Sequence, residues 1–307
     1  MGKTAVIGTA FVDLKGFAKS SYDPLGRNLG EVKILHGGVG RNVVENFANV
    51  GMPVSFVGML EDSAIGRDVE RRLIEIGAGL EHMIKVPENG IGMWLAILDD
   101  TGELAGSISK MPDISGLEAL LEQEGDEIVS EAEAIVLEVD LSESIAEMVI
   151  ELAKKHGKCV YSIVGNLSVV LARKDLVRQT DCFICNEIEA AKFFGDDEVI
   201  DFSPSQMLGF LPAAAKECGI SSMVVTMGEK GAVYYDGADE SAGICPSIPT
   251  EVVDTTGAGD AFFSGTVMGL IRGSSLSDAV RYGARLASAT IGRKEASCPV
   301  DKGFFLR

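Results

Sequence analysis

The sequence predicts a doubly wound α/β fold, in which a mostly parallel β-sheet carries helices on both faces. Short runs rich in β-branched residues alternate with longer amphipathic stretches along most of the chain, and this rhythm is typical of parallel sheets. Glycine and proline end several of the longer stretches, as they end helices. The 307 residues, 46% apolar and 24% charged, have an ordinary globular composition.

The expected elements alternate from the amino terminus onward. Apolar residues at positions 65, 69, 73 and 76 recur at helical spacing, for example. The predicted strands cover Ala5–Gly8, Val54–Val57, Ala134–Val139, Cys159–Ile163, Cys182–Cys185 and Ser222–Thr226. The predicted helices cover Val43–Val50, Ile65–Gly77, Ser144–His156, Glu187–Phe194, Ala261–Ile271 and Leu276–Ile291.

Two stretches break this alternation. Residues 14–36 are rich in glycine and polar residues, and residues 90–111 carry apolar segments on either side of Asp100-Thr101-Gly102. The second stretch is expected to form a β-hairpin. We expect both stretches to build a small sheet that projects from the main one, so that residues 1–307 form a single domain with a β-sheet lid. No role is assigned to the acidic loop Asp196–Pro204.

The net charge of −19 argues against a nucleic-acid partner, because phosphate neutralisation needs clustered Lys and Arg. The first ten residues hold too short an apolar stretch for a secretory signal, and no run of about 18 apolar residues predicts a membrane helix. A cytoplasmic protein is therefore expected. Cys182 and Cys185 form a C-x-x-C pair inside an apolar, strand-like run, so a buried strand is favoured over a metal or redox site.

The segment DTTGAGD, from Asp254 to Asp260, leads directly into the apolar stretch AFFSGTVMGLI. Gly257, Ala258 and Gly259 have little or no side chain, so a ligand can approach their backbone. Free N–H groups at the start of a helix bind phosphate. A carboxylate beside such a site would repel phosphate, but it can take a proton from an attacking hydroxyl. Asp260 is therefore predicted to be the base of a phosphoryl transfer.

Other interpretations of this loop were weighed. A helix-capping Asp on a glycine-rich turn would explain an isolated Gly-Ala-Gly-Asp. A dinucleotide fingerprint is rejected because Phe262 stands at the position of its last glycine and no opening βαβ unit precedes the loop. The sequence also contains no Walker loop and no H-R-D or D-F-G signature of protein kinases.

Further segments agree with phosphoryl transfer. His36–Asn42 is a second glycine-rich turn that enters a helix, and Asn42 suits hydrogen bonding to sugar hydroxyls, although a helix cap explains it equally well. Asp13 follows the first strand, where the carboxyl end of a parallel strand places ligand contacts, although a turn Asp is about as probable.

Two more segments follow later strands. Asn186 and Glu189 lie at i and i+3 after the strand at 182–185, which suits a hydrated Mg²⁺ bridged to phosphates. Thr226, Gly228 and Gly231 follow the strand at 222–226 and could cradle a nucleotide, or form an ordinary β-turn.

The segments DTTGAGD at 254–260 and GGVGRN at 37–42 resemble the two signatures of the PfkB, or ribokinase-like, carbohydrate kinases. Asn186-x-x-Glu189 and Thr226-x-Gly228-x-x-Gly231 are similar to two further motifs of that family, in the same order, so the resemblance spans most of the chain. One departure is Phe11, which stands where many relatives have Asn.

The resemblance implies an ATP- and Mg²⁺-dependent kinase for a small sugar or nucleoside, with a lid that can pair across a homodimer. For the chemistry it implies Asp260 as the base, Gly257, Ala258 and Gly259 as the anion hole, and Asp13, Gly38 and Asn42 as substrate ligands. For the cofactors it implies Asn186 and Glu189 at Mg²⁺ and phosphate, with Glu189 acting through water, Thr226, Gly228 and Gly231 at the nucleotide, and Asp254 and Thr256 at a K⁺ site.

Within the family, residues 37–51 and 98–114 are most similar to the pseudouridine kinase subgroup. A pseudouridine or related nucleoside 5′-kinase is thus the first hypothesis, and a kinase of ribose, fructose or a keto-deoxy sugar is the second. A non-catalytic sugar sensor is the third. Stacking on a base would use aromatic residues near the lid, for which Phe11, Phe17 and Trp94 are candidates. A sugar acid would require a basic residue there, for which Arg27, Lys33 and Lys110 are candidates.

Overall fold

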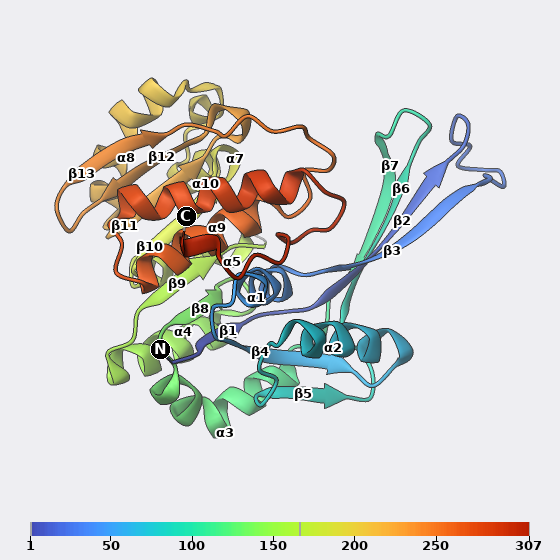
Figure 1. The fold of residues 1–307 in the computed structure, drawn as a ribbon, viewed down its shortest axis with the longest axis horizontal. Helices are drawn as coiled ribbons and strands as arrows, with labels where there is room; N and C mark the ends of the chain where they lie inside the picture. Colours follow the sequence, from blue (N-terminus) through green and yellow to red (C-terminus); the bar gives the residue numbers. More distant parts are fainter. Residues whose placement is uncertain (1, 166, 307) are drawn as a thin grey trace.

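The computed structural model describes residues 2–165 and 167–306, which form a large sheet between two layers of helices and a small sheet that projects from them (Figure 1). In order across the large sheet lie β13 (Ser241–Cys245), β12 (Ala232–Asp236), β11 (Ser222–Thr226), β10 (Cys182–Asn186), β9 (Val160–Ile163), β8 (Ile135–Glu138), β1 (Thr4–Ile7), β4 (Val54–Glu61) and β5 (Met83–Val86). The strands from β11 to β5 run parallel, and β12 pairs antiparallel with both its neighbours. The predicted mostly parallel sheet is confirmed.

Side chains of the central strands alternate between two apolar cores, one on each face of the sheet. In β10, Phe183 and Cys185 enter one core, and Cys182 and Ile184 enter the other. The two cysteines therefore point to opposite faces, and burial raises the pKa of both thiols. This arrangement confirms the predicted buried strand.

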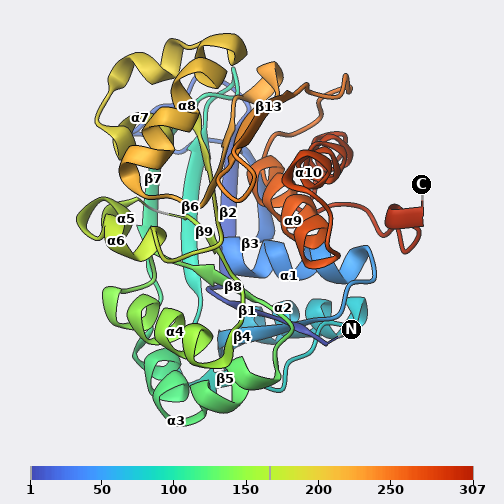
Figure 2. The same cartoon turned by 90° about the vertical axis from the view of Figure 1, so that its left-hand side faces the viewer.

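Helices cover both faces (Figure 2). One face carries α3 (Ser115–Glu131), α4 (Glu143–His156), α5 (Ser168–Ala172), α6 (Lys174–Val177), α7 (Glu187–Phe194) and α8 (Pro204–Cys218). The other carries α1 (Val39–Asn49), α2 (Ala64–Ile76), α9 (Ala258–Ile271) and α10 (Leu276–Ile291). Short 3₁₀ turns are η1 (Asp197–Asp201), η2 (Gly228–Lys230) and η3 (Phe304–Leu306).

Local sequence signals set the ends of several helices. The Ser142 hydroxyl accepts a hydrogen bond from the Ile145 N–H at the start of α4, and Gly157 ends that helix with φ 63°. Two predicted starts were too late, because α1 begins at Val39 and α9 at Ala258. In both cases part of the glycine-rich turn forms the first turn of the helix. The prediction started later because glycine has a low helix propensity.

The small sheet has the order β3 (Gly30–Gly37), β2 (Phe11–Ala18), β6 (Gly92–Leu98) and β7 (Leu104–Lys110). β2 and β6 pair in parallel, and the other two pairs are antiparallel, including the predicted hairpin of β6 and β7. The sheet begins at Phe11, three residues before the predicted stretch. Asp13 therefore lies within β2, directly opposite Trp94 of β6.

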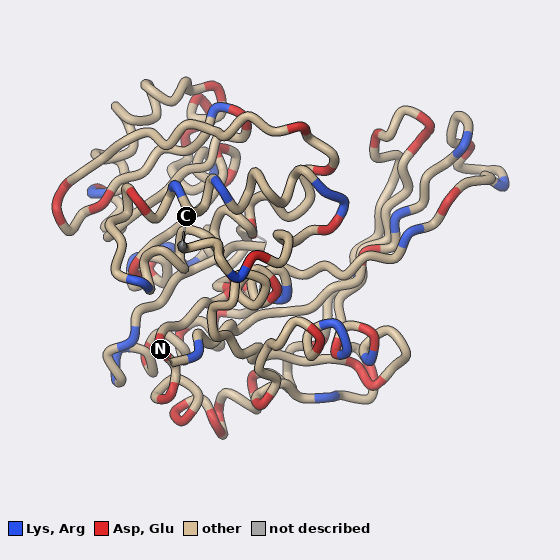
Figure 3. The backbone as a smooth tube through the Cα atoms, viewed as in Figure 1, with Lys and Arg blue, Asp and Glu red and all other residues tan. Residues whose placement is uncertain are grey.

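Charged residues are spread around the molecule, with Lys and Arg interspersed among the more numerous Asp and Glu (Figure 3). Within residues 2–165 and 167–306, no helix combines the length and the apolar character that a membrane span requires.

Candidate active site

A cleft of about 1040 Å³ lies where the carboxyl ends of the parallel strands meet the base of the small sheet. This is the edge at which open α/β sheets bind ligands. Its lining includes eight residues singled out from the sequence, which are Phe11, Asp13, Gly38, Asn42, Trp94, Asn186, Glu189 and Thr256. Glu138 and Ala296 are also part of the lining.

The loop before α9 has a fixed geometry. The Asp254 carboxylate accepts a hydrogen bond from the Thr256 N–H at 2.8 Å. Burial alone would raise the pKa of Asp254, but this bond and the charges of Lys15 and Lys33 outweigh it and lower the pKa. Gly257 caps the helix with φ 79°, a conformation that favours glycine.

Two glycines of this loop face different surroundings. A Cβ atom at Gly257 would lie 2.0 Å from the carbonyl oxygen of Ala296, whereas a Cβ at Gly259 would meet nothing within 4 Å. Gly257 is therefore required by packing against residue 296, and Gly259 is the position open to a ligand. The Ala258 N–H donates to the Thr255 carbonyl at 3.2 Å. Within the described residues, the N–H groups of Gly257 and Gly259 have no protein acceptor.

Asp260 lies in the first turn of α9 and is joined to α1. The Asn42 amide Nδ2 donates to Asp260 Oδ2 at 2.6 Å. Burial raises the pKa of Asp260 to about 6, although the bond from Asn42 and the charge of Arg41 act against this rise. A carboxyl group with such a pKa is ionised at neutral pH and basic enough to accept a proton from an alcohol during its attack.

Asp13 and Gly38 lie on the small-sheet side of the cleft. Gly38 precedes α1 with φ 94°, and a Cβ there would lie 2.6 Å from the Phe11 N atom. Burial raises the pKa of Asp13, while Lys15 and Arg41 oppose the rise. Gly37 lies close to the Asp13 carboxylate, since a Cβ at Gly37 would be 2.8 Å from Asp13 Oδ1.

Asn186 and Glu189 form a reciprocal capping box at the start of α7. Asn186 Oδ1 accepts from the Glu189 N–H at 2.8 Å, and Glu189 Oε2 accepts from the Asn186 N–H at 2.8 Å. Sequence reasoning did not foresee this local role, although Asn followed three residues later by Glu is a capping pattern. Burial raises the pKa of Glu189, and the charge of Asp140 adds to the effect.

Thr226, Gly228 and Gly231 follow β11, next to the end of β10. Thr226 pairs in register with Asn186, and its hydroxyl donates to the Cys185 carbonyl at 3.4 Å. Gly228 begins the turn η2 with φ 55°, and Gly231 follows the end of the turn with φ 95°. The described cleft lining does not include these three residues, so they lie beside it along the same sheet edge.

Glu138 lines the cleft but was not singled out by the sequence analysis. It ends β8, is buried, and accepts hydrogen bonds from the Thr9 N–H at 2.8 Å and from the Thr9 hydroxyl at 3.0 Å. Burial raises its pKa to about 8, and the charges of Asp140 and Asp260 add to the rise. A single acidic residue within the apolar run AIVLEV was a signal that could have located it.

Of the aromatic candidates, Phe11 and Trp94 line the cleft, whereas Phe17 lies at a smaller pocket farther along the small sheet. Of the basic candidates, Lys33 lies over the Phe17 ring at 4.8 Å, and Arg27 and Lys110 are exposed. The lining of the cleft includes none of these three basic residues. The described residues contain no cluster of three or more His, Cys, Asp or Glu that could hold a metal ion by itself.

Residues 1–302 match the family model described as pfkB family carbohydrate kinase. The chain belongs to the PfkB family. This PfkB kinase is 34% identical over 298 residues to guanosine-inosine kinase of Exiguobacterium acetylicum, with 96% of each chain covered. It is 25% identical to pseudouridine kinase of Escherichia coli K12, covering 96% of this chain and 92% of that protein.

The fold of the PfkB kinase is ribokinase-like. Ribokinase of Arabidopsis thaliana, solved with ribose and ATP, superposes with a TM-score of 0.84 at 25% identity and covers 99% of this chain and 97% of that one. The protein is thus a phosphotransferase that acts on a hydroxyl of a sugar or nucleoside. The resemblance to pseudouridine kinase is real but weaker than that to the guanosine-inosine enzyme.

Proposed function

We propose that this PfkB kinase transfers the terminal phosphoryl group of ATP to the 5′-hydroxymethyl group of a nucleoside. The observation that carries the proposal is the position of Asp260, which lies beside unengaged backbone amides at the start of α9 and is held there by Asn42. The aromatic residues Phe11 and Trp94 in the cleft support a nucleoside over a free sugar.

In this mechanism Asp260 accepts the proton of the attacking hydroxyl. The N–H groups of Gly257 and Gly259, at the positive end of the α9 dipole, stabilise charge on the transferring phosphoryl group. Asp13 and Asn42 bind hydroxyl groups of the sugar, because both are polar and line the cleft beside Gly38. The alcohol oxygen bonds to phosphorus, the bond to the ADP oxygen breaks, and ADP leaves.

Cations fit the residues around the phosphates. Glu189 uses Oε2 in the capping box, which leaves Oε1 for a water of hydrated Mg²⁺. Mg²⁺, when bound, would neutralise phosphate charge. Asp254 and Thr256 supply oxygen atoms suited to K⁺, and Thr226, Gly228 and Gly231 are proposed to contact the nucleotide because they extend the same sheet edge.

A purine nucleoside is the first substrate to test, given the 34% identity to guanosine-inosine kinase. Pseudouridine is the second, because the similarity of residues 37–51 and 98–114 to that subgroup suggested it from the sequence. Both would place the base against Trp94 and Phe11.

The test is ADP release from ATP with guanosine, inosine, pseudouridine, uridine, ribose and fructose, in the wild type and Asp260→Asn. We expect at least one nucleoside to be phosphorylated with higher kcat/KM than either sugar. Asp260→Asn should lower kcat by about 10²- to 10⁴-fold while ATP still binds in calorimetry. Wild-type turnover in Asp260→Asn would refute the role of Asp260 as the base. A higher kcat/KM for ribose than for every nucleoside would refute the proposal of a nucleoside substrate.

We also propose that a second copy of this chain covers the outer face of the small sheet. Leu14, Ile34, Leu95 and Ile108 oppose one another across its four strands, and Ile34 and Ile108 are 61% and 69% exposed. An apolar row of this kind is typical of an interface. Sedimentation should give a dimer for the wild type and a monomer for Ile108→Lys; a wild-type monomer would refute the proposal.

A further inference from the structure

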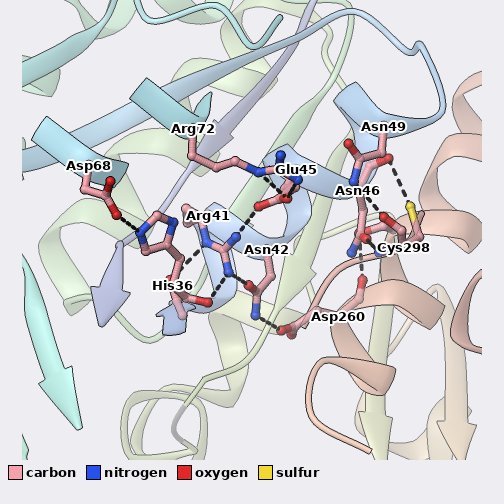
Figure 4. A network of polar contacts seen from close by, with 12 residues as sticks. His36, Arg41, Asn42, Glu45, Asn46, Asn49, Asp68, Arg72, Asp260 and Cys298 are labelled. Carbon is pink, nitrogen blue, oxygen red and sulfur yellow. Dashed lines mark hydrogen bonds and ion pairs between the residues drawn. The ribbon is translucent and has the colours of Figure 1, made fainter. Parts of the chain in front are cut away.

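Asp260 is the end of a chain of polar contacts that runs through α1 to α2 (Figure 4). Arg41 donates to Asn42 Oδ1 and to the Glu45 carboxylate, and Arg72 Nε of α2 donates to Glu45 Oε1 at 2.9 Å. Arg41 and Glu45 are almost fully buried. Burying a charge is costly unless an opposite charge lies beside it. Here Glu45 is paired with both Arg41 and Arg72.

The contact from Arg41 decides which way the Asn42 amide faces. A guanidinium group can only donate hydrogen bonds, so the oxygen of the amide must point toward Arg41. The amide nitrogen then points toward Asp260 and donates to its carboxylate at 2.6 Å. Without Arg41 the amide oxygen would lose its buried donor, and only the contact with Asp260 would still hold the Asn42 side chain in this position.

The backbone at the end of β3 holds Arg41 in place. Its Nε donates to the Gly37 carbonyl at 3.1 Å, and its Nη2 donates to the His36 carbonyl at 2.6 Å. Together with Glu45 and Asn42, these carbonyl groups accept hydrogen bonds from different N–H groups of the planar guanidinium. A lysine ammonium cannot reproduce this pattern, because its donors radiate from one atom.

We propose that Arg41 is a positioning residue that, through the amide of Asn42, holds the Asp260 carboxylate in the orientation in which it accepts the substrate proton. This inference rests on the proposed function, in which Asp260 is the base. Glu45 and Arg72 anchor Arg41 from the side of α2. The guanidinium of Arg41 is buried and its hydrogen bonds within the described residues go to protein acceptors, so Arg41 acts through Asn42 rather than on the substrate.

The charges that face Asp260 give a second readout. Arg41 from α1 lowers its pKa, whereas Glu189 from α7 raises it, and the negative charge of Asp260 in turn helps to raise the pKa of Glu138 on β8. Removing Arg41 takes away the cation of this set together with the orientation of Asn42. The acid limb of the pH profile of kcat/KM should then move to higher pH.

The experiment is a double-mutant cycle on the full-length protein with ATP and its best nucleoside. Arg41→Met and Asn42→Ala should each lower kcat by roughly tenfold or more, with KM for ATP within about twofold of wild type. In the Asn42→Ala background, Arg41→Met should cost less than about threefold, because residues that act as a unit are not additive. Arg67→Met in α2, whose partner Asp62 lies outside the network, is the control and should keep wild-type kcat.

Additive losses, or a wild-type kcat in Arg41→Met, would overturn the inference. Should Arg41→Met fail to fold, Arg41→Lys tests the same positioning role, because it keeps the positive charge but lacks the planar guanidinium group. It should keep the acid limb close to wild type while kcat still falls, and a wild-type kcat in this variant would overturn the inference. Asp260→Asn is measured alongside. If Asp260→Asn is inactive while the losses in Arg41→Met and Asn42→Ala are additive, only the positioning role of Arg41 is refuted. If Asp260→Asn is fully active, the proposed role of Asp260 as the base is refuted.

Discussion

The ammonium group of Lys15 lies 3.2 Å from the hydroxyl of Thr256, although 241 positions separate the two residues in the sequence. Lys15 belongs to β2 of the small sheet, and Thr256 belongs to the loop that presents the amides of α9. The contact therefore joins the small sheet to the proposed phosphate site. Lys15 is also 5.9 Å from the centre of the Trp94 ring.

Lys15→Met should lower kcat/KM for the nucleoside by about tenfold, because it removes one hydrogen bond to a charged group and a cation that faces Asp13 and Asp254. Steady-state kinetics at two salt concentrations measures the effect. Lys19→Met, at an exposed position just beyond the same strand, is the control. Equal kinetics in the two variants would show that the contact with Thr256 is unimportant.

Gly257 and Gly259 should respond differently to substitution. Gly257→Ala places a Cβ against the Ala296 carbonyl and strains a positive φ, so unfolding should need at least about 1–3 kcal/mol less free energy. A Cβ at Gly259 meets no protein atom within 4 Å, so we expect Gly259→Val to change the melting temperature little. Its side chain would occupy the proposed phosphate position, and kcat/KM for ATP should fall roughly 100-fold. Thermal denaturation and kinetics of both variants separate packing from ligand contact, and a Gly259→Val enzyme of normal activity would contradict the proposed anion site.

The pH dependence of turnover should reflect two carboxyl groups with raised pKa values. Activity should fall below about pH 6 as Asp260 takes up a proton. Glu138 is neutral below about pH 8, and its ionisation above that pH adds a negative charge near Asp260, so activity should fall again. Glu138→Gln should remove the alkaline limb and keep the acid limb. If Glu138→Gln and the wild type lost activity at the same alkaline pH, Glu138 would not be the group whose ionisation causes that loss.

Glu138 also has a consequence for stability. Its pKa is higher in the folded protein than the ordinary value of 4.5, so its neutral form is preferred in the folded state. Its contribution to the free energy of unfolding is therefore largest at low pH and is lost as pH rises through about 8. Denaturant titrations of the wild type and Glu138→Gln should converge below about pH 4.5, diverge progressively between that pH and about pH 8, and differ by a constant amount above it.

Trp94→Leu should raise KM for a nucleoside by roughly tenfold, because stacking of an aromatic side chain on a base is worth about 1–3 kcal/mol. KM for ATP should stay close to wild type, and activity on ribose should change little. Phe17→Leu is a matched control, since Phe17 lies outside the described lining of the cleft. Equal losses with ribose and the nucleoside would indicate a structural role for Trp94.

Much of the fold could be predicted from the sequence because the signals are local. The helices at Glu187–Phe194 and Leu276–Ile291 have the predicted bounds, since caps and amphipathic spacing lie within the segments themselves. The helices α3 and α8 and the strands β5, β12 and β13 were not predicted. The apolar periodicity of α3 is interrupted by acidic residues and Gly125, so its burial against α4 and the sheet, rather than propensity, decides its structure.

The sequence by itself determined the doubly wound architecture, the glycine-rich turns at 37–42 and 254–260, and the residue types needed for phosphoryl transfer. Only the tertiary structure decided how these groups meet. It joins Asn42 to Asp260 across 218 positions and turns Gly257 toward Ala296 rather than toward a ligand. It also places Glu138 in the lining of the cleft and brings Lys15 into contact with Thr256. Such contacts depend on the path of the whole chain, because the order of strands and the packing of helices bring together segments that no local pattern relates.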